Sequence, residues 1–67
     1  MKHFQVCHEV RAADGTVLRS GWSTVFGPTV SEEEAYERSH AKVRQWMDED
    51  ENAVLFIVHP GRYLPWA

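Results

Sequence analysis

Apolar and polar residues alternate over residues 3–11 at the start of the chain. A period of two is typical of a β-strand with one apolar face. The side chains on that face are Phe4, Val6, His8 and Val10. A turn-forming segment follows at residues 12–16, in which Gly15 can adopt the positive φ that a tight turn needs. A second strand then runs to residue 26, where a Gly-Pro pair stops it. The pattern predicts a β-hairpin over residues 3–26.

The register of this hairpin depends on the type of turn. A two-residue Asp-Gly turn would pair Val10 with Arg19 and mix apolar with polar side chains on each face. A type I turn with a glycine bulge pairs Val10 with Leu18 and keeps the apolar side chains together. We therefore predict the second register. It also sets Glu9 opposite Arg19 as an ion pair on the outer face of the hairpin.

The next segment carries the signals of an amphipathic helix. Ser31 is a good N-cap, and Glu34, three residues later, completes a capping box. Apolar or small residues then recur at helical spacing. They are Ala35, Tyr36, Ser39, Val43, Trp46 and Met47. We predict a helix over residues 32–48. The carboxylates of residues 48–51 oppose the helix dipole, so we expect a frayed last turn and Asn52 as a left-handed cap.

Residues 53–58, with the sequence Ala-Val-Leu-Phe-Ile-Val, are apolar at every position. A short apolar run rich in β-branched residues is typical of a strand buried on both faces. We predict this strand over residues 53–59. Such a strand needs a packing element on each of its two faces, and the helix covers one of them. We expect the C-terminal tail, residues 60–67, or another copy of the chain to cover the other face.

These elements predict a single domain, residues 1–67, with the order β-β-α-β and a C-terminal tail. The fold class is α+β: a small single-layer antiparallel or mixed sheet, one helix packed on one face, and the tail as a candidate fourth strand. A right-handed crossover makes the third strand parallel to the second. The third strand then lies beside the first, in the order 2-1-3, or beside the second.

Composition narrows the function classes. The 67 residues carry a formal net charge of -3, whereas a domain held mainly by phosphate contacts usually has a basic excess. The single Cys7 excludes an internal disulfide and favours a reducing compartment. Neither a signal-peptide pattern nor a membrane-spanning run is evident. We expect a cytoplasmic protein that binds no membrane, and the net charge argues against nucleic acid as its partner.

The sequence contains no catalytic or cofactor-binding motif that we recognise. Its histidines do not indicate a metal site. His3 and Cys7 are four residues apart on a strand, roughly 13 Å at about 3.3 Å per residue, which is too far for one ion. His8 and His40 could approach each other between strand and helix, but a third ligand is not evident. We predict a protein without catalytic activity, cofactor or metal.

Two segments are candidate protein-binding sites. The first is the acidic run Asp48, Glu49, Asp50 and Glu51, which would suit a basic partner surface, although most such runs are only solvated. The second is the tail, which contains residue types that are enriched at binding hot spots. Its candidate residues are Arg62, Tyr63, Leu64 and Trp66. The alternative role of these residues is to cover the apolar strand.

The order of elements is similar to that of several short phage-encoded inhibitors, including a phage inhibitor of RNA polymerase and some anti-CRISPR proteins. This resemblance is one of layout and carries no specific residue. The leading hypothesis is a small non-enzymatic protein-binding module or inhibitor that occupies a partner's surface. The alternatives are a homo-oligomeric structural module, such as a homodimer that pairs through strand 53–58 or through the tail, and a weak nucleic-acid binder. The cations for the last alternative are Arg11, Arg19, Arg38, Lys42, Arg44 and Arg62.

Overall fold

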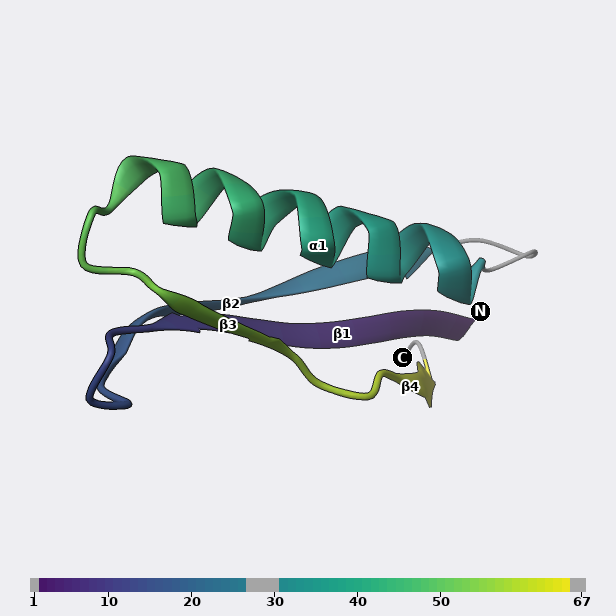
Figure 1. The fold of residues 1–67 in the computed structure, drawn as a ribbon. Helices are drawn as coiled ribbons and strands as arrows, with labels where there is room; N and C mark the ends of the chain where they lie inside the picture. The colour runs from purple at the N-terminus through teal and green to yellow at the C-terminus, as the bar shows by residue number, and fades with distance from the viewer. Residues whose placement is uncertain (1, 27–30, 66–67) are drawn as a thin grey trace.

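The computed structural model describes residues 2–26 and 31–65, and in it one helix lies along one face of a four-stranded sheet (Figure 1). The elements in chain order are β1 (Lys2–Arg11), β2 (Val17–Phe26), α1 (Glu32–Glu49), β3 (Leu55–Val58) and β4 (Arg62–Pro65). The fold is the predicted α+β arrangement, and the tail does form a fourth strand. Trp66 lies outside the described residues.

β1 is the central strand of the sheet. It pairs with β2 along one edge and with both β3 and β4 along the other, and all these pairings are antiparallel. The strand order is therefore 2-1-3, and β3 is parallel to β2, as the crossover argument predicts. The expectation that the tail covers β3 is wrong. β4 pairs with residues 2–5 of β1, whereas β3 pairs with residues 8–11, so the two strands follow one another along the same edge.

The hairpin turn has the predicted form. The Ala12 N–H donates to the Thr16 carbonyl over 2.9 Å, and the Gly15 N–H donates to the Ala12 carbonyl over 3.0 Å. Gly15 has a φ of 90°, and no other described residue has a positive φ. This is the geometry of a type I turn followed by a glycine bulge, in which a side chain at Gly15 would be strained.

A second bulge directly after the turn makes the predicted register wrong. Arg11 pairs with Val17, as predicted, but Val10 pairs with Arg19, and Leu18 has no partner in β1. The pairing is therefore shifted by one residue over the remainder of β1. The turn imposes the pairing of Arg11 with Val17, whereas packing under α1 requires the pairing of Val10 with Arg19. The extra residue in β2 allows both pairings.

The shift places Arg19 on the side of the sheet that faces α1. Its guanidinium group lies 4.5 Å from the ring centroid of Trp46 and donates to Glu49 over 3.2 Å. The predicted ion pair between Glu9 and Arg19 is therefore wrong, and Glu9 pairs with Arg11 instead. Arg19 supplies the cation that the last turn of α1 does not contain in its own sequence.

Helix α1 begins at the predicted N-cap, but the Glu34 carboxylate accepts from Arg38 rather than completing the predicted capping box, and the end of the helix also differs from the prediction. The Ser31 hydroxyl accepts from the Glu34 N–H over 3.1 Å, which satisfies one of the free N–H groups of the first turn. At the other end Asp50 is the cap, and its N–H donates to the Trp46 carbonyl. The Asp50 carboxylate also accepts from the Asn52 N–H over 2.9 Å. Asn52 has no positive φ, so its prediction as a left-handed cap is wrong.

The core lies between α1 and the sheet and consists of two apolar clusters. Their buried members are Phe4, Val6, Val25 and Ala35 in one cluster, and Val10, Val43, Trp46 and Ala53 in the other. His8 and Ser39 lie between the clusters along β1 and α1, and both are buried. The His8 Nδ1 and the Ser39 Oγ are 3.0 Å apart, so these two polar groups satisfy each other where water does not reach.

Strand β3 is far less buried than its apolar sequence predicts. Val58 packs against both core clusters. Leu55 and Phe56, however, are 50% and 41% exposed, and the preceding Val54 is 50% exposed. The prediction of a strand buried on both faces is wrong, because β3 stands at an edge of the sheet and α1 covers only one side of it.

Candidate protein-binding face

The side of the sheet that faces away from α1 is here called the outer face. Because side chains alternate along a strand, Cys7 and Glu9 lie on this face whereas Val6 and His8 lie under α1. Residues paired in an antiparallel ladder point to the same side, so the partners of such β1 residues complete the outer face. Its large apolar side chains, here called the outer patch, are Trp22, Phe26, Leu55, Ile57 and Leu64.

The outer patch is open to solvent over much of its area. Trp22 is 56% exposed, Phe26 52% and Leu55 50%. Helix α1 lies on the opposite side of the sheet, and no other described element packs against the outer face (Figure 1). Scattered apolar residues are common on protein surfaces, but several large ones on one sheet face make that face a candidate binding surface.

Polar side chains divide the outer patch. Glu9 and Arg11 form an ion pair in the middle of the sheet, and the His59 Nε2 lies 3.5 Å from the same Glu9 carboxylate oxygen. The Arg62 side chain lies on the outer face opposite Gln5 and makes no ion pair with another described residue. The outer face therefore combines apolar surface with one cation that a partner could use.

Only part of the predicted acidic site is available for binding. Glu49 accepts from Arg19 and from the Gln45 amide, and Asp50 caps the helix. Asp48 and Glu51 make no hydrogen bond or ion pair with the described residues. Two of the four predicted carboxylates thus have structural roles, and the helix end presents a weaker acidic surface than the sequence indicates.

The predicted tail residues are divided between the two sides of the sheet. Arg62 and Leu64 lie on the outer face, whereas Tyr63 pairs with Phe4 on the α1 side, where their rings are 5.0 Å apart. Desolvation and then the neighbouring Glu32 carboxylate raise the pKa of Tyr63. Tyr63 thus contacts the buried Phe4 while remaining 49% exposed, and the tail residues do not share one face of the sheet.

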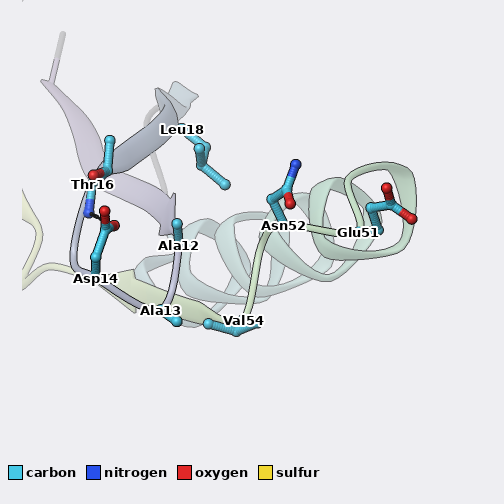
Figure 2. A pocket seen from close by; sticks show the side chains of 8 residues that line it. All are labelled: Ala12, Ala13, Asp14, Thr16, Leu18, Glu51, Asn52 and Val54. Carbon is cyan, nitrogen blue, oxygen red and sulfur yellow. Dashed lines mark hydrogen bonds between the residues drawn. The ribbon is translucent and has the colours of Figure 1, made fainter.

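A shallow hollow of about 570 Å³ lies between the hairpin turn and the segment that joins α1 to β3 (Figure 2). Leu18, the unpaired residue of the bulge, lines it together with Val54 and Asn52. The Asp14 carboxylate in its wall accepts from the Thr16 N–H, and this hydrogen bond lowers the pKa of Asp14. The hollow is also lined by the Glu51 carboxylate, but its lining contains no histidine, cysteine or lysine, so it brings together no arrangement of an acid, a base and a nucleophile.

The histidines are also separated from one another. His8 is buried against Ser39 and Trp46, and burial, followed by the nearby Lys42 charge, lowers the pKa of His8. His40 instead stacks edge-on against Phe56, with the ring centroids 6.0 Å apart. Within residues 2–26 and 31–65, no group of three or more His, Cys, Asp or Glu residues could hold a metal ion.

The six cations that would serve a nucleic-acid site do not form one surface. Arg11 is paired with Glu9, Arg19 with Glu49, and Arg38 with Glu34. The other three make no ion pair with a described residue, and they lie on two different elements. They are Lys42 and Arg44 on α1 and Arg62 on β4.

Sequence reasoning missed the two most exposed aromatic residues of the outer patch. The predicted register set Trp22 opposite Val6 and therefore under the helix, but Trp22 pairs with Cys7 on the outer face. The neighbouring Gly21 was the signal in the sequence that could have revealed this orientation. A Cβ atom at Gly21 would lie only 3.0 Å from the Trp46 ring, so the strand position beneath α1 requires a residue without a side chain. Gly21 occupies that position, and Trp22 therefore points to the outer face.

No family model, curated protein or solved structure matches this chain. No helix in the described part of the chain has the length and hydropathy to span a bilayer.

Proposed function

We propose that this chain is a small, non-enzymatic, cytoplasmic protein-binding module that acts as an inhibitor by occupying the surface of a partner protein. The outer patch is its binding surface. The observation that carries the proposal is the exposure of Trp22 and Leu55 on a sheet face that no described element covers. In a reducing compartment the Cys7 thiol of the same face stays unpaired.

The composition of the outer face supports this role. Aromatic residues and arginine dominate the energy of protein–protein interfaces. Trp22 and Phe26 stand on a strand held by nine paired residues of β1, so little backbone entropy is lost when they bind.

The chemistry of the outer face defines the partner. Trp22, Phe26 and Leu55 require an apolar surface, and the unpaired Arg62 favours a carboxylate beside it. Because Glu9 and Arg11 already neutralise each other, they add polar contacts without imposing a sign of charge on the partner. We therefore propose a folded protein with an apolar patch bordered by acidic residues.

The test is a stoichiometric capture experiment with matched variants. Trp22→Ser removes apolar area from the outer patch, whereas Asp48→Asn combined with Glu51→Gln removes the free carboxylates of the helix end. The wild-type chain and the carboxylate variant are expected to retain the same protein from a cell extract. Trp22→Ser is expected to weaken the binding of that purified protein by about tenfold or more, because exposed Trp residues are frequent hot spots.

Two outcomes would count against the proposal. One is that the wild-type chain retains no specific partner. The other is that Trp22→Ser binds as well as wild type while the carboxylate variant does not, which would move the site to the helix end. Both variants change exposed side chains, so a circular-dichroism spectrum identical to wild type is the control for folding.

A further inference from the structure

We propose that two copies of the chain form a two-fold symmetric dimer by antiparallel pairing of their β3 strands. The pairing joins the two sheets into one, with both helices on the same side. This dimer does not depend on the outer-face function proposed above, because it uses the edge of the sheet and a flank of α1.

The first observation is the free backbone of β3. The His59 N–H donates to the Cys7 carbonyl over 2.9 Å, and antiparallel hydrogen bonds occur at every second residue. Ile57 therefore points its backbone groups at β1, and just before the strand the Val54 N–H donates to the Arg11 carbonyl, while the backbone groups of Phe56 and Val58 point to the open edge. No described strand pairs with this edge, so it offers donors and acceptors to a second copy.

The second observation is the composition of β3. Residues 53–58 contain no charged residue and no proline, and Val54, Leu55 and Phe56 are exposed. Natural edge strands are protected by shortness, charge, proline or bulges, and β3 has its length of four residues but neither charge nor proline. The absence of charge and proline leaves this edge open to pairing with a second copy.

The third observation is a self-complementary charge pattern on the flank of α1 next to β3. The His40 ring contacts Phe56, with the ring centroids 6.0 Å apart. Glu37 lies three residues before His40, Arg44 lies four residues after it, and neither makes an ion pair with a described residue. Two antiparallel helices related by an axis at Phe56 and His40 would place Glu37 of each copy opposite Arg44 of the other.

The space for this contact is already present. A hollow of about 540 Å³ lies along this flank of α1. The residues that line it are Glu33, Tyr36, Glu37, His40, Ala41 and Arg44. In the dimer the hollows of the two copies face each other across the axis, and the Phe56 and His40 side chains of both copies occupy the space between the helices. The structure thus assigns Phe56 to the centre of the interface.

Charge exchange gives the most specific test. In Glu37→Arg two arginines meet at each contact, and in Arg44→Glu two glutamates meet, so each variant is expected to dimerise about tenfold or more weakly than wild type. An equimolar mixture of the two variants restores both contacts, but only in the mixed dimer. Sedimentation equilibrium should give twice the 7.8 kDa chain mass for wild type and for the mixture, with dissociation of each variant alone.

Backbone substitution tests the strand pairing itself. Phe56→Pro removes an N–H that points away from β1, so it leaves the pairing with β1 intact while blocking a second copy. We expect Phe56→Pro to be monomeric and Phe56→Ala to retain weakened dimerisation. If Phe56→Pro does not fold by circular dichroism, the charge-exchange variants still decide the question, because both lie on an exposed helix flank.

Three results would overturn the proposal. The first is a wild-type chain that remains monomeric at millimolar concentration. The second is a dimer that is not weakened in the charge variants, or that is not restored when the two variants are mixed. The third is a dimer that dissociates in Trp22→Ser but not in a folded Phe56→Pro variant. The last result would place self-association on the outer face.

Discussion

The two edges of the sheet are made differently. The β2 edge has ten residues, and it carries a bulge at Leu18 and a cover from the helix, since Arg38 donates to the Thr24 carbonyl over 3.4 Å. The β3 edge has four residues, all apolar, and no described side chain donates to its outward carbonyls. The β2 edge thus carries a bulge and a hydrogen bond from the helix, whereas the β3 edge has only its shortness to limit pairing with another chain.

The two sides of the sheet also differ in how they contact helix α1. On the β2 side, Trp46 packs over Gly21 and under the guanidinium group of Arg19, so that the helix, the strand and an ion pair are joined at one place. On the β3 side, Val58 contributes to the core while Leu55 and Phe56 remain exposed. The β2 side therefore holds α1 on the sheet, whereas the β3 side leaves apolar surface exposed to solvent.

The largest effect is expected from Trp46→Ala. Removing this buried side chain leaves a cavity between α1 and β2 and should lower the free energy of unfolding by about 3–5 kcal/mol. Met47→Ala, next to it and only partly buried, is the matched control and should cost clearly less. Urea denaturation followed by circular dichroism measures both. Equal losses in the two variants would show that α1 is not held chiefly from the β2 side.

The next effect is expected from Gly61→Ala on the β3 side. A Cβ atom at Gly61 would lie 2.5 Å from the Phe4 ring and 2.8 Å from Val6, so the chain between β3 and β4 must shift. We expect a loss of about 1–3 kcal/mol of unfolding free energy. Gly21→Ala meets Trp46 at 3.0 Å and should cost less in the same urea titration. A Gly61→Ala variant as stable as wild type would contradict the close packing of this edge.

A smaller effect on the free energy of unfolding is expected when the pH is lowered. It comes from His8, which lies on β1 between the β2 side and the β3 side of the sheet. Burial lowers the pKa of His8 in the folded state, and the Lys42 charge lowers it further. Below about pH 6.5, the ordinary value for histidine, the unfolded chain therefore binds a proton that the folded chain does not bind. The free energy of unfolding should fall as the pH drops below this value and level off once the pH is below the folded pKa.

His8→Gln and His40→Gln separate this effect from other titrations. The pH dependence near 6 should be reduced in urea titrations of His8→Gln and retained in those of His40→Gln, since His40 lies on the surface. A wild-type slope in His8→Gln would assign the acid effect to another group.

The smallest change in stability, and the sharpest test of edge protection, is expected from Arg38→Ala. The substitution removes an exposed ion pair with Glu34 and uncovers the Thr24 carbonyl, so the unfolding free energy should fall by less than about 1 kcal/mol. Larger assemblies should appear in light scattering, because both edges of the sheet are then open. Arg38→Lys, which keeps the charge, should not produce them. Unchanged light scattering for Arg38→Ala would mean that the bulge alone protects β2.

The helix and the fold class could be predicted because their determinants are local. Ser31 caps the first turn, and Ala35, Ser39, Val43 and Trp46 are all buried, as their spacing predicts. The end of the helix could not be predicted in the same way. Its cation, Arg19, comes from β2, thirty positions away from Glu49 in sequence. Local charge alone indicated a frayed end, whereas the structure shows a capped one.

The register could not be predicted because two requirements conflict. The turn around Gly15 fixes one pairing, and the fit of Gly21 beneath Trp46 fixes another that differs by one residue. Only the bulge at Leu18 satisfies both, and nothing in the alternation of the sequence marks it. This single residue decides that Trp22 lies on the outer face, so the candidate site could not be found without the structure.

The pairing of Lys2 with Pro65 brings the first and last described strands of the chain together at one end of β1. A short linker between these two strands could therefore close the backbone into a ring without crossing either face of the sheet. New ends could then be opened at residues 13–15 of the hairpin turn, at the far end of β1. A chain permuted in this way would keep every strand pairing described above while changing the order in which the strands are synthesised, and its folding rate would report whether the hairpin forms first.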